Sequence, residues 1–108
     1  MKQIFFLPFI DRQDTGPLLG LGLVYPSVGA MERIGPDWDW IWIDAQHGDI
    51  DIGEAASLVR TAELIERPAL VRIPAQDPAW VGKMLDLGAA GVIVPMIENL
   101  EQIGRAHV

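Results

Sequence analysis

The sequence of 108 residues contains no cysteine. This absence excludes disulfide bonds, zinc sites built from thiolates and catalysis by a cysteine nucleophile. A chain without disulfides is compatible with a reducing compartment, and we expect a cytoplasmic protein.

Basic residues are scarce. The chain has 8 Lys and Arg against 15 Asp and Glu, which gives a formal net charge of −7. Binding to nucleic acid needs a concentrated basic patch, and the sequence shows none. We therefore expect no nucleic-acid partner, and the acidic balance chiefly favours solubility.

Long hydrophobic runs are also missing. The N-terminal "MKQIFFLPFIDRQD" holds an apolar run that is too short to span a bilayer, and it ends in charged residues rather than in a small-residue cleavage site. We therefore expect a soluble protein with no membrane partner. Residues 1–17 form an N-terminal segment to which we assign no function, and residues 18–108 form the folded domain.

The sequence does contain a regular alternation of strand-like and helix-like segments. Apolar runs predict strands at residues 18–25, 40–44, 69–73 and 91–96. Between them, helix signals predict helices at residues 28–34, 51–67 and 77–88, and a further helix that starts near residue 98. This order is typical of βαβ units and predicts an α/β fold with a parallel sheet.

Capping residues mark several of these helix ends. Ser27 and Asp77 are expected N-caps, Pro78 suits the first position of a helix, and Gly88 suits its end. Pro68 is expected to end the helix that begins after Asp51. The predicted apolar face of that helix consists of Ile52, Ala55, Ala56, Val59, Ala62, Leu64 and Ile65.

Polar groups interrupt the apolar strands near their carboxyl ends, where parallel α/β folds build their sites. Asp44 and His47 follow the second strand, and Arg72 lies within the third. A neutral imidazole is a competent general base, and a guanidinium suits bidentate binding of a carboxylate.

Each of these residues also has a structural interpretation. His47 is equally consistent with a loop histidine that only forms hydrogen bonds, and Arg72 with the partner of a structural acid such as Asp44 or Asp77. Asp44 either satisfies neighbouring amides or orients a water, a metal or a substrate.

Two further features have less direct interpretations. Trp38, Trp40 and Trp42 are expected to be core or helix-packing groups rather than a ligand-binding set. Asp86 stands at the end of a predicted helix, where an acid is unfavourable for the helix dipole. In a β/α barrel this position lies on the side opposite the active site. His107, near the end of the chain, is assigned no role.

Three segments together resemble the HpcH/HpaI aldolase/citrate lyase family of metal-dependent class II pyruvate aldolases. They are "WDWIWIDAQHGDID", "LVRIPAQDP" and "MLDLGAAGVIVPMIEN". The resemblance implies a (β/α)₈ TIM barrel, of which this chain covers about the first four β/α units, a half-barrel truncated at its C-terminus. It also implies cleavage of 4-hydroxy-2-oxo acids to pyruvate, or a related 2-oxo acid, plus an aldehyde.

The resemblance also implies roles for individual residues. His47 matches the catalytic base, which acts through a water, and Arg72 matches the arginine that holds the oxo acid and steadies its enolate. Asp44 matches an acid near the metal and substrate. Asp86 matches an aspartate that pairs with the catalytic histidine, which requires a neighbouring subunit and so predicts a homo-oligomer.

The resemblance implies a divalent cation (Mg²⁺, Mn²⁺ or Co²⁺) whose ligands are expected beyond the end of this chain, so no metal ligand is assigned. The family commonly has Glu where Gln46 stands here. A complete barrel needs about 250 residues, so we expect the 108-residue chain to be inactive alone. The alternatives are another lyase of the phosphoenolpyruvate/pyruvate barrel superfamily and a non-catalytic half-barrel association module.

Overall fold

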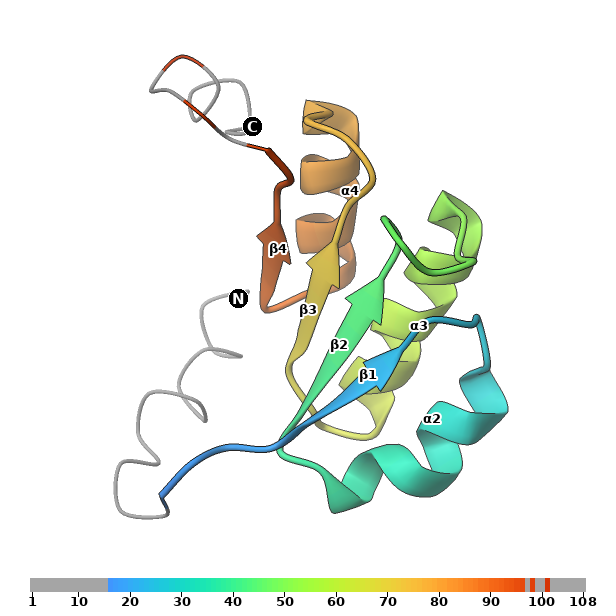
Figure 1. Ribbon diagram of the computed structural model, residues 1–108. Helices are drawn as coiled ribbons and strands as arrows, with labels where there is room; N and C mark the ends of the chain where they lie inside the picture. Colours follow the sequence, from blue (N-terminus) through green and yellow to red (C-terminus); the bar gives the residue numbers. More distant parts are fainter. Residues whose placement is uncertain (1–15, 97, 99–100, 102–108) are drawn as a thin grey trace.

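A computed structural model describes residues 16–96, 98 and 101 of the chain. Three helices and four strands alternate along it (Figure 1). In chain order the elements are β1 (Gly20–Leu23), α2 (Val28–Ile34), the 3-10 helix η2 (Gly35–Asp37), β2 (Trp40–Asp44), α3 (Ile52–Leu64), β3 (Ala69–Arg72), α4 (Pro78–Leu87) and β4 (Gly91–Ile93). The predicted order of strands and helices is confirmed as far as β4, and the 3-10 helix η2 is an additional element.

The strands form one parallel sheet in the order β1-β2-β3-β4. All three helices cover the same face of this sheet, and the opposite face carries no described helix (Figure 1). Because every strand points the same way, the carboxyl ends of β1 to β4 meet at one edge. A parallel sheet with sequential strand order and helices on one face is the arrangement of consecutive units in a β/α barrel.

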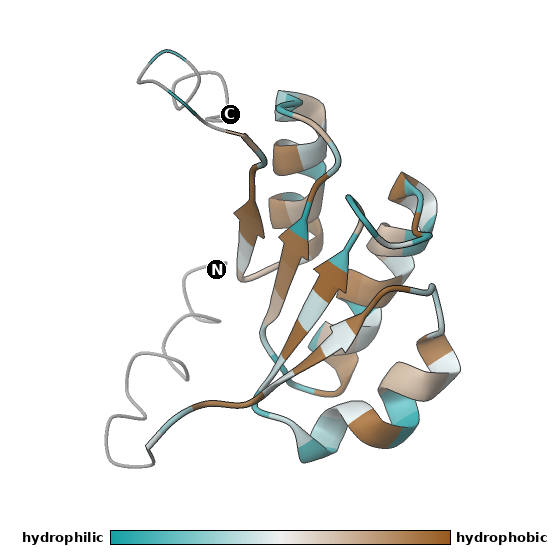
Figure 2. Cartoon of the chain, viewed as in Figure 1, coloured by the Kyte–Doolittle hydropathy of each residue, from teal (hydrophilic) through white to brown (hydrophobic). Residues whose placement is uncertain are grey.

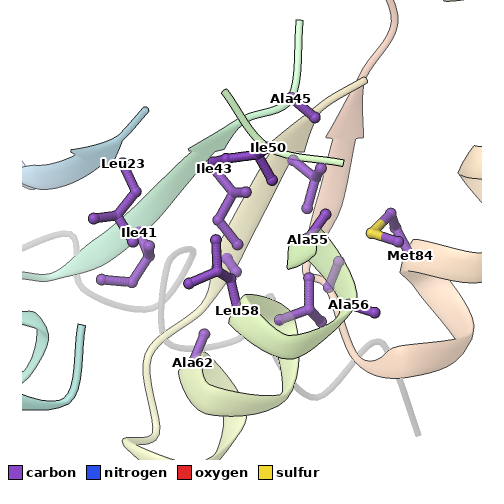
Figure 3. Packing of buried hydrophobic residues seen from close by; sticks show 14 of the residues in the cluster. Leu23, Ile41, Ile43, Ala45, Ile50, Ala55, Ala56, Leu58, Ala62 and Met84 are labelled. Atoms are coloured by element: carbon purple, nitrogen blue, oxygen red, sulfur yellow. The ribbon is translucent and has the colours of Figure 1, made fainter. Parts of the chain in front are cut away.

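The hydrophobic core lies between the sheet and the helices (Figure 3). Side chains alternate between the two faces of a strand, so Ile41 and Ile43 in β2 point to the helices and are fully buried. They meet the small residues Ala55 and Ala62 of α3, which allow the helix to lie close to the sheet. The core therefore holds β2 and β3 firmly, and these are the strands that carry the candidate site residues.

The helix starts follow the capping residues that the sequence predicts. The side chain of Ser27 accepts a hydrogen bond from the backbone N–H of Ala30 at the start of α2. Asp51 and Glu54 form a reciprocal capping box at the start of α3. Asp77 caps α4, with Pro78 at its first turn, and α4 ends at Gly88, whose φ of 114° suits glycine.

Three expectations differ from the structure. Strands β1, β3 and β4 are shorter than predicted, because their flanking residues are irregular backbone, bends or, at residues 95–96, a turn. Helix α3 ends at Leu64 rather than near Pro68, because Glu66 adopts a left-handed conformation with φ of 59°. Leu64 was expected on the apolar face but is 82% exposed.

Trp40 and Trp42 do not pack against the helices, contrary to expectation. Trp40 and Trp42 alternate with Ile41 and Ile43, so they lie on the face of the sheet that points away from the helices. Trp38 lies outside the strand and is 36% exposed. The alternation assigns the isoleucines rather than the tryptophans to the core.

None of the helices in the described part of the chain is long and apolar enough to cross a membrane. Most of the helix predicted from residue 98, His107 and most of the N-terminal segment lie outside the described residues. The division of the chain at residue 17 stays a prediction.

Candidate active site

Asp44 is the last residue of β2, and its side chain is almost fully buried at the carboxyl edge of the sheet. Its Oδ1 accepts hydrogen bonds from the backbone N–H groups of Gln46 and His47, at 3.0 and 2.9 Å. The same carboxylate binds Arg72 of β3, with Nε to Oδ1 at 3.2 Å and Nη2 to Oδ2 at 2.5 Å. Strand pairing explains the contact, because Asp44 and Arg72 are direct partners in the β2–β3 register.

These contacts stabilise the charged form of the Asp44 carboxyl. The hydrogen bonds from Arg72 lower the pKa of Asp44 from its ordinary value of 3.8 to about 2. Burial opposes this shift, and the two backbone N–H donors add to it. The same hydrogen-bonded pair raises the pKa of Arg72. The pair is therefore fully ionised at neutral pH.

Within the described part of the chain, the guanidinium of Arg72 does not use all of its hydrogen-bond donors. An arginine has five N–H donors, and Asp44 occupies the edge formed by Nε and Nη2. Among the described residues no other side chain or backbone group binds this guanidinium, and the Arg72 side chain is 28% exposed. The edge formed by Nη1 and Nη2 is therefore available for a second carboxylate. The hydropathy colours show a polar end on the apolar strand β3 at this place (Figure 2).

His47 lies in the loop after β2, and it is exposed. Its backbone N–H is bound to Asp44, so the loop turns back over the end of its own strand. The backbone N–H of Asp49 donates to the carbonyl of Val24 at 2.7 Å, which fixes the loop to the end of β1. A Cβ at Gly48 would collide with the backbone carbonyls of Asp44 and Val24, so only glycine fits there without a shift.

The structure brings Asp44, Arg72 and the His47 loop together at one edge of the sheet. The sequence also allowed Arg72 to be the partner of a structural acid, either Asp44 or Asp77. Arg72 does pair with Asp44, whereas Asp77 caps α4. Asp86 is not part of this group. It lies in the last turn of α4, which leads to the start of β4 at the opposite edge of the sheet, and it is exposed.

Two residues near the site were not assigned from the sequence. Trp42 lies beneath Arg72, with the guanidinium carbon 5.3 Å from the ring centroid, and Gly48 permits the close approach of the His47 loop. The signal for Trp42 is its spacing of two residues from Asp44, which places both on one face of β2. Gly48 directly follows His47, and a glycine beside a candidate base is a signal for a tight loop.

No group of three or more His, Cys, Asp or Glu side chains within the described residues is arranged to hold a metal ion. Asp44 is the only acid shown bonding Arg72, and its carboxylate already accepts four hydrogen bonds. The residues that the structure describes therefore do not fit a divalent cation by themselves. The expectation that the metal ligands lie farther along the chain stays a prediction.

The fold and the edge of the sheet described above define a β/α-barrel protein with an ionised site at the carboxyl ends of its strands. The family model of the HpcH/HpaI aldolase/citrate lyase family matches residues 30–108, and the chain belongs to this family. This membership confirms the resemblance and the fold class, with four strands of a partial barrel described.

Individual relatives are aldolases by name. The chain is 33% identical over 97 residues to a hydroxypyruvate/pyruvate aldolase of Paraburkholderia phytofirmans. This match covers 87% of this chain and 37% of the relative. It is 32% identical over 96 residues to a 2-dehydro-3,6-dideoxy-6-sulfogluconate aldolase of Pseudomonas putida. This match covers 88% of this chain and 37% of the relative. The chain thus spans little more than a third of the length of these relatives.

Solved structures agree with this assignment. A protein of the same family from Burkholderia cenocepacia superposes with a TM-score of 0.75 at 32% identity, over 94% of this chain and 41% of that one. Macrophomate synthase superposes with a TM-score of 0.74 at 26% identity, over 95% of this chain and 35% of that one. The described strands and helices therefore correspond to one part of a larger barrel.

Proposed function

We propose that the protein takes part in aldol cleavage as a carbon–carbon lyase, with a 4-hydroxy-2-oxo acid as substrate and pyruvate, or a related 2-oxo acid, plus an aldehyde as products. The observation that carries the proposal is the free edge of the Arg72 guanidinium beside the His47 loop, both fixed by the Asp44 carboxylate. The names of the relatives support a 2-oxo acid as the substrate class.

The chemistry needs a base and a group that stabilises negative charge. His47 removes the proton of the C4 hydroxyl, through a water, and the C3–C4 bond breaks as this oxygen becomes the aldehyde carbonyl. The electron pair of that bond passes into the 2-oxo group and leaves an enolate, which C3 protonation converts to the 2-oxo acid. The free edge of Arg72 binds the anionic oxygens of the substrate and of the enolate.

Asp44 acts on this reaction mainly by positioning Arg72 and His47. Its carboxylate accepts hydrogen bonds from Arg72 and from the loop that carries His47, so both keep a fixed separation. Because Asp44 remains charged well below neutral pH, this arrangement does not change between about pH 5 and pH 8.

Two parts of the proposal need groups that the described residues of a single chain do not supply. The divalent cation that the family implies needs ligands that the described residues do not provide. Asp86 lies at the opposite edge of the sheet, so its pairing with His47 requires a second copy of the chain in a homo-oligomer.

Substitution of His47 and Arg72 tests the proposal. His47→Ala keeps the backbone N–H that binds Asp44 and removes an exposed side chain, so turnover should fall about 10²- to 10⁴-fold with an unchanged unfolding midpoint. Arg72→Lys should raise KM for the oxo acid about tenfold, because a point charge replaces a planar fork. Arg60→Lys, on the exposed side of α3, is the matched control. Parallel loss of folding and turnover in His47→Ala would contradict a catalytic role.

A second candidate function is a non-catalytic half-barrel that associates with another chain. The sheet face opposite the helices carries the half-buried Trp40, Trp42 and Leu70, and within the described residues strands β1 and β4 have only one neighbour each. Open edges and an apolar face favour association. A stable, inactive assembly whose size is unaffected by 2-oxo acids would favour this function over aldol cleavage.

A further inference from the structure

Three side chains form a row on the sheet face that points away from the helices. Trp40 and Trp42 come from β2, and Arg72 comes from the neighbouring strand β3. The two indole rings have their centroids 6.0 Å apart at an interplanar angle of 57°, and the Arg72 guanidinium carbon lies 5.3 Å from the Trp42 centroid. The first distance is in the range of favourable aromatic pairs, and the second is in the range of a cation–π contact.

A glycine lies beside Trp40, the residue of this row farthest from Arg72. Gly20 of β1 is the direct partner of Trp40 in the sheet, and a Cβ at Gly20 would collide with the Trp40 ring. The Trp40 indole therefore lies against bare backbone of β1, close to the sheet. Trp42, two residues farther along the same strand, lies against Trp40 on the same face.

The Arg72 guanidinium is consequently held by two different contacts. The Asp44 carboxylate binds its Nε–Nη2 edge, and the guanidinium carbon lies over the Trp42 ring, 5.3 Å from its centroid. An ion pair at a single edge leaves a partly exposed side chain able to swing toward solvent, and the ring limits this motion. The free edge of Nη1 and Nη2 is thereby aimed before any ligand arrives.

We infer that Trp42 is a positioning residue for Arg72, and that its ring sets the affinity of the site for the carboxylate of a 2-oxo acid. The inference rests on the proposed function, because the carboxylate is the ligand proposed for Arg72. A cation–π contact predicts the order in which substitutions of Trp42 weaken it. An indole attracts a cation most strongly, a phenyl ring less, and an aliphatic side chain has no ring quadrupole. Leucine keeps much of the apolar bulk but loses the cation–π contact.

The affinity for oxamate, an unreactive carboxylate analogue of pyruvate, measures the effect of each substitution. Trp42→Leu should weaken oxamate binding about tenfold, and Trp42→Phe should stay within about threefold of wild type. Trp80→Leu is the matched control, because Trp80 is a partly buried tryptophan on α4 that packs on the helix side of the sheet. Its oxamate affinity should equal that of wild type. Equal losses in Trp42→Leu and Trp42→Phe would overturn the inference, since packing alone would then explain them.

A spectroscopic readout tests the contact without any ligand. A ring face against a guanidinium shifts the Nε–Hε resonance of Arg72, so this resonance should move toward its random-coil position in Trp42→Leu and only partly so in Trp42→Phe. An Arg72 resonance unaffected by Trp42→Leu would overturn the inference.

The Arg72→Lys variant separates failure of the inference from failure of the proposed function. If Arg72→Lys weakens oxamate binding but Trp42→Leu does not, Trp42 does not position Arg72 and the inference is wrong. If Arg72→Lys binds oxamate as tightly as wild type, the proposed role of Arg72 is wrong, whatever the resonance shows.

Discussion

The carboxylate of Asp44 joins two groups that come from different parts of the chain. It binds the guanidinium of β3 through both oxygens and the His47 loop through two backbone N–H groups. Removal of this carboxylate leaves a partly buried guanidinium and two N–H groups without their partner, a much larger disturbance than loss of an exposed ion pair. Asp44 is therefore both a stability residue and the residue that keeps the site assembled.

The lowered pKa of Asp44 makes stability depend on pH in a defined window. In the unfolded chain the carboxyl titrates near 3.8, and in the folded chain near 2. Its contribution, on the order of 2 kcal/mol, is thus fully present above about pH 4 and is lost as the pH falls toward 2. Urea unfolding of wild type at pH 7 and pH 3 should show part of this loss.

Asp44→Asn removes the titrating group from the same site. The variant should be less stable than wild type at pH 7 by about 2 kcal/mol and should lose less stability between pH 7 and pH 3. Asp49→Asn, which changes an exposed acid in the same loop, is the control and should behave as wild type. A wild-type pH dependence in Asp44→Asn would show that other groups cause the effect.

The polar residues of the site were directly predictable from the sequence, whereas Trp42 was indicated only by its spacing of two residues from Asp44. An acid or an arginine in an apolar strand is conspicuous, so Asp44 and Arg72 stand out directly. A tryptophan in the same strand looks like core, because its hydrophobicity does not reveal which face of the sheet it occupies. The pairing of Asp44 with Arg72 decides that face, and it depends on the β2–β3 register.

At the level of elements, the loop after β2 is held by close backbone contacts. Gly48 faces the carbonyls of Asp44 and Val24, and the neighbouring Asp49 N–H binds Val24. Any side chain at position 48 must push the loop away from the ends of β1 and β2. The position of His47 relative to Arg72 is therefore sensitive to this glycine.

Gly48→Ala should lower turnover more than it lowers oxo-acid affinity. The loop with His47 moves, whereas Arg72 on β3 keeps its contacts with Asp44 and Trp42. We expect a destabilisation of about 1–3 kcal/mol and a fall in kcat with KM within about threefold of wild type. Gly22→Ala is the matched control, because a Cβ at Gly22 meets nothing within 4 Å. An unchanged kcat in Gly48→Ala would contradict the proposed constraint on the loop.

Helix starts were predictable from local sequence, but the end of α3 was not. Ser27, Asp51 and Asp77 cap helices through neighbours only two or three residues away. The turn that ends α3, in which Glu66 is left-handed, also makes a distant contact. Arg67 donates to the carbonyls of Trp38, at 2.7 Å, and Pro36, at 2.5 Å. This contact ties the turn after α3 to the segment before β2, and local propensity contains no information about it.

For the whole molecule, the positions of His47 and Asp86 at opposite edges of the sheet have a direct consequence. If the two residues act together, each active site combines His47 of one subunit with Asp86 of another. His47→Ala and Asp86→Ala homo-oligomers should both be nearly inactive.

Mixed oligomers of these two variants test the arrangement. Random pairing of His47→Ala and Asp86→Ala chains restores a site that has both residues, so turnover should recover to about a quarter of wild type in a dimeric arrangement. The mixture is measured after co-refolding of differently tagged chains, with each variant refolded alone as the control. Mixed oligomers that remain inactive, or a fully active Asp86→Ala enzyme, would contradict a shared site.

The most direct measurement of the central claim is turnover of a 4-hydroxy-2-oxo acid, detected as released pyruvate. The purified protein is assayed with Mn²⁺ or Mg²⁺ and then with a chelator, beside the His47→Ala variant. We expect an assembly with complete barrels to release pyruvate in a metal-dependent manner, and we expect His47→Ala to abolish most of this release. Folded, complete barrels that bind oxamate through Arg72 but release no pyruvate from any 4-hydroxy-2-oxo acid would contradict aldol cleavage.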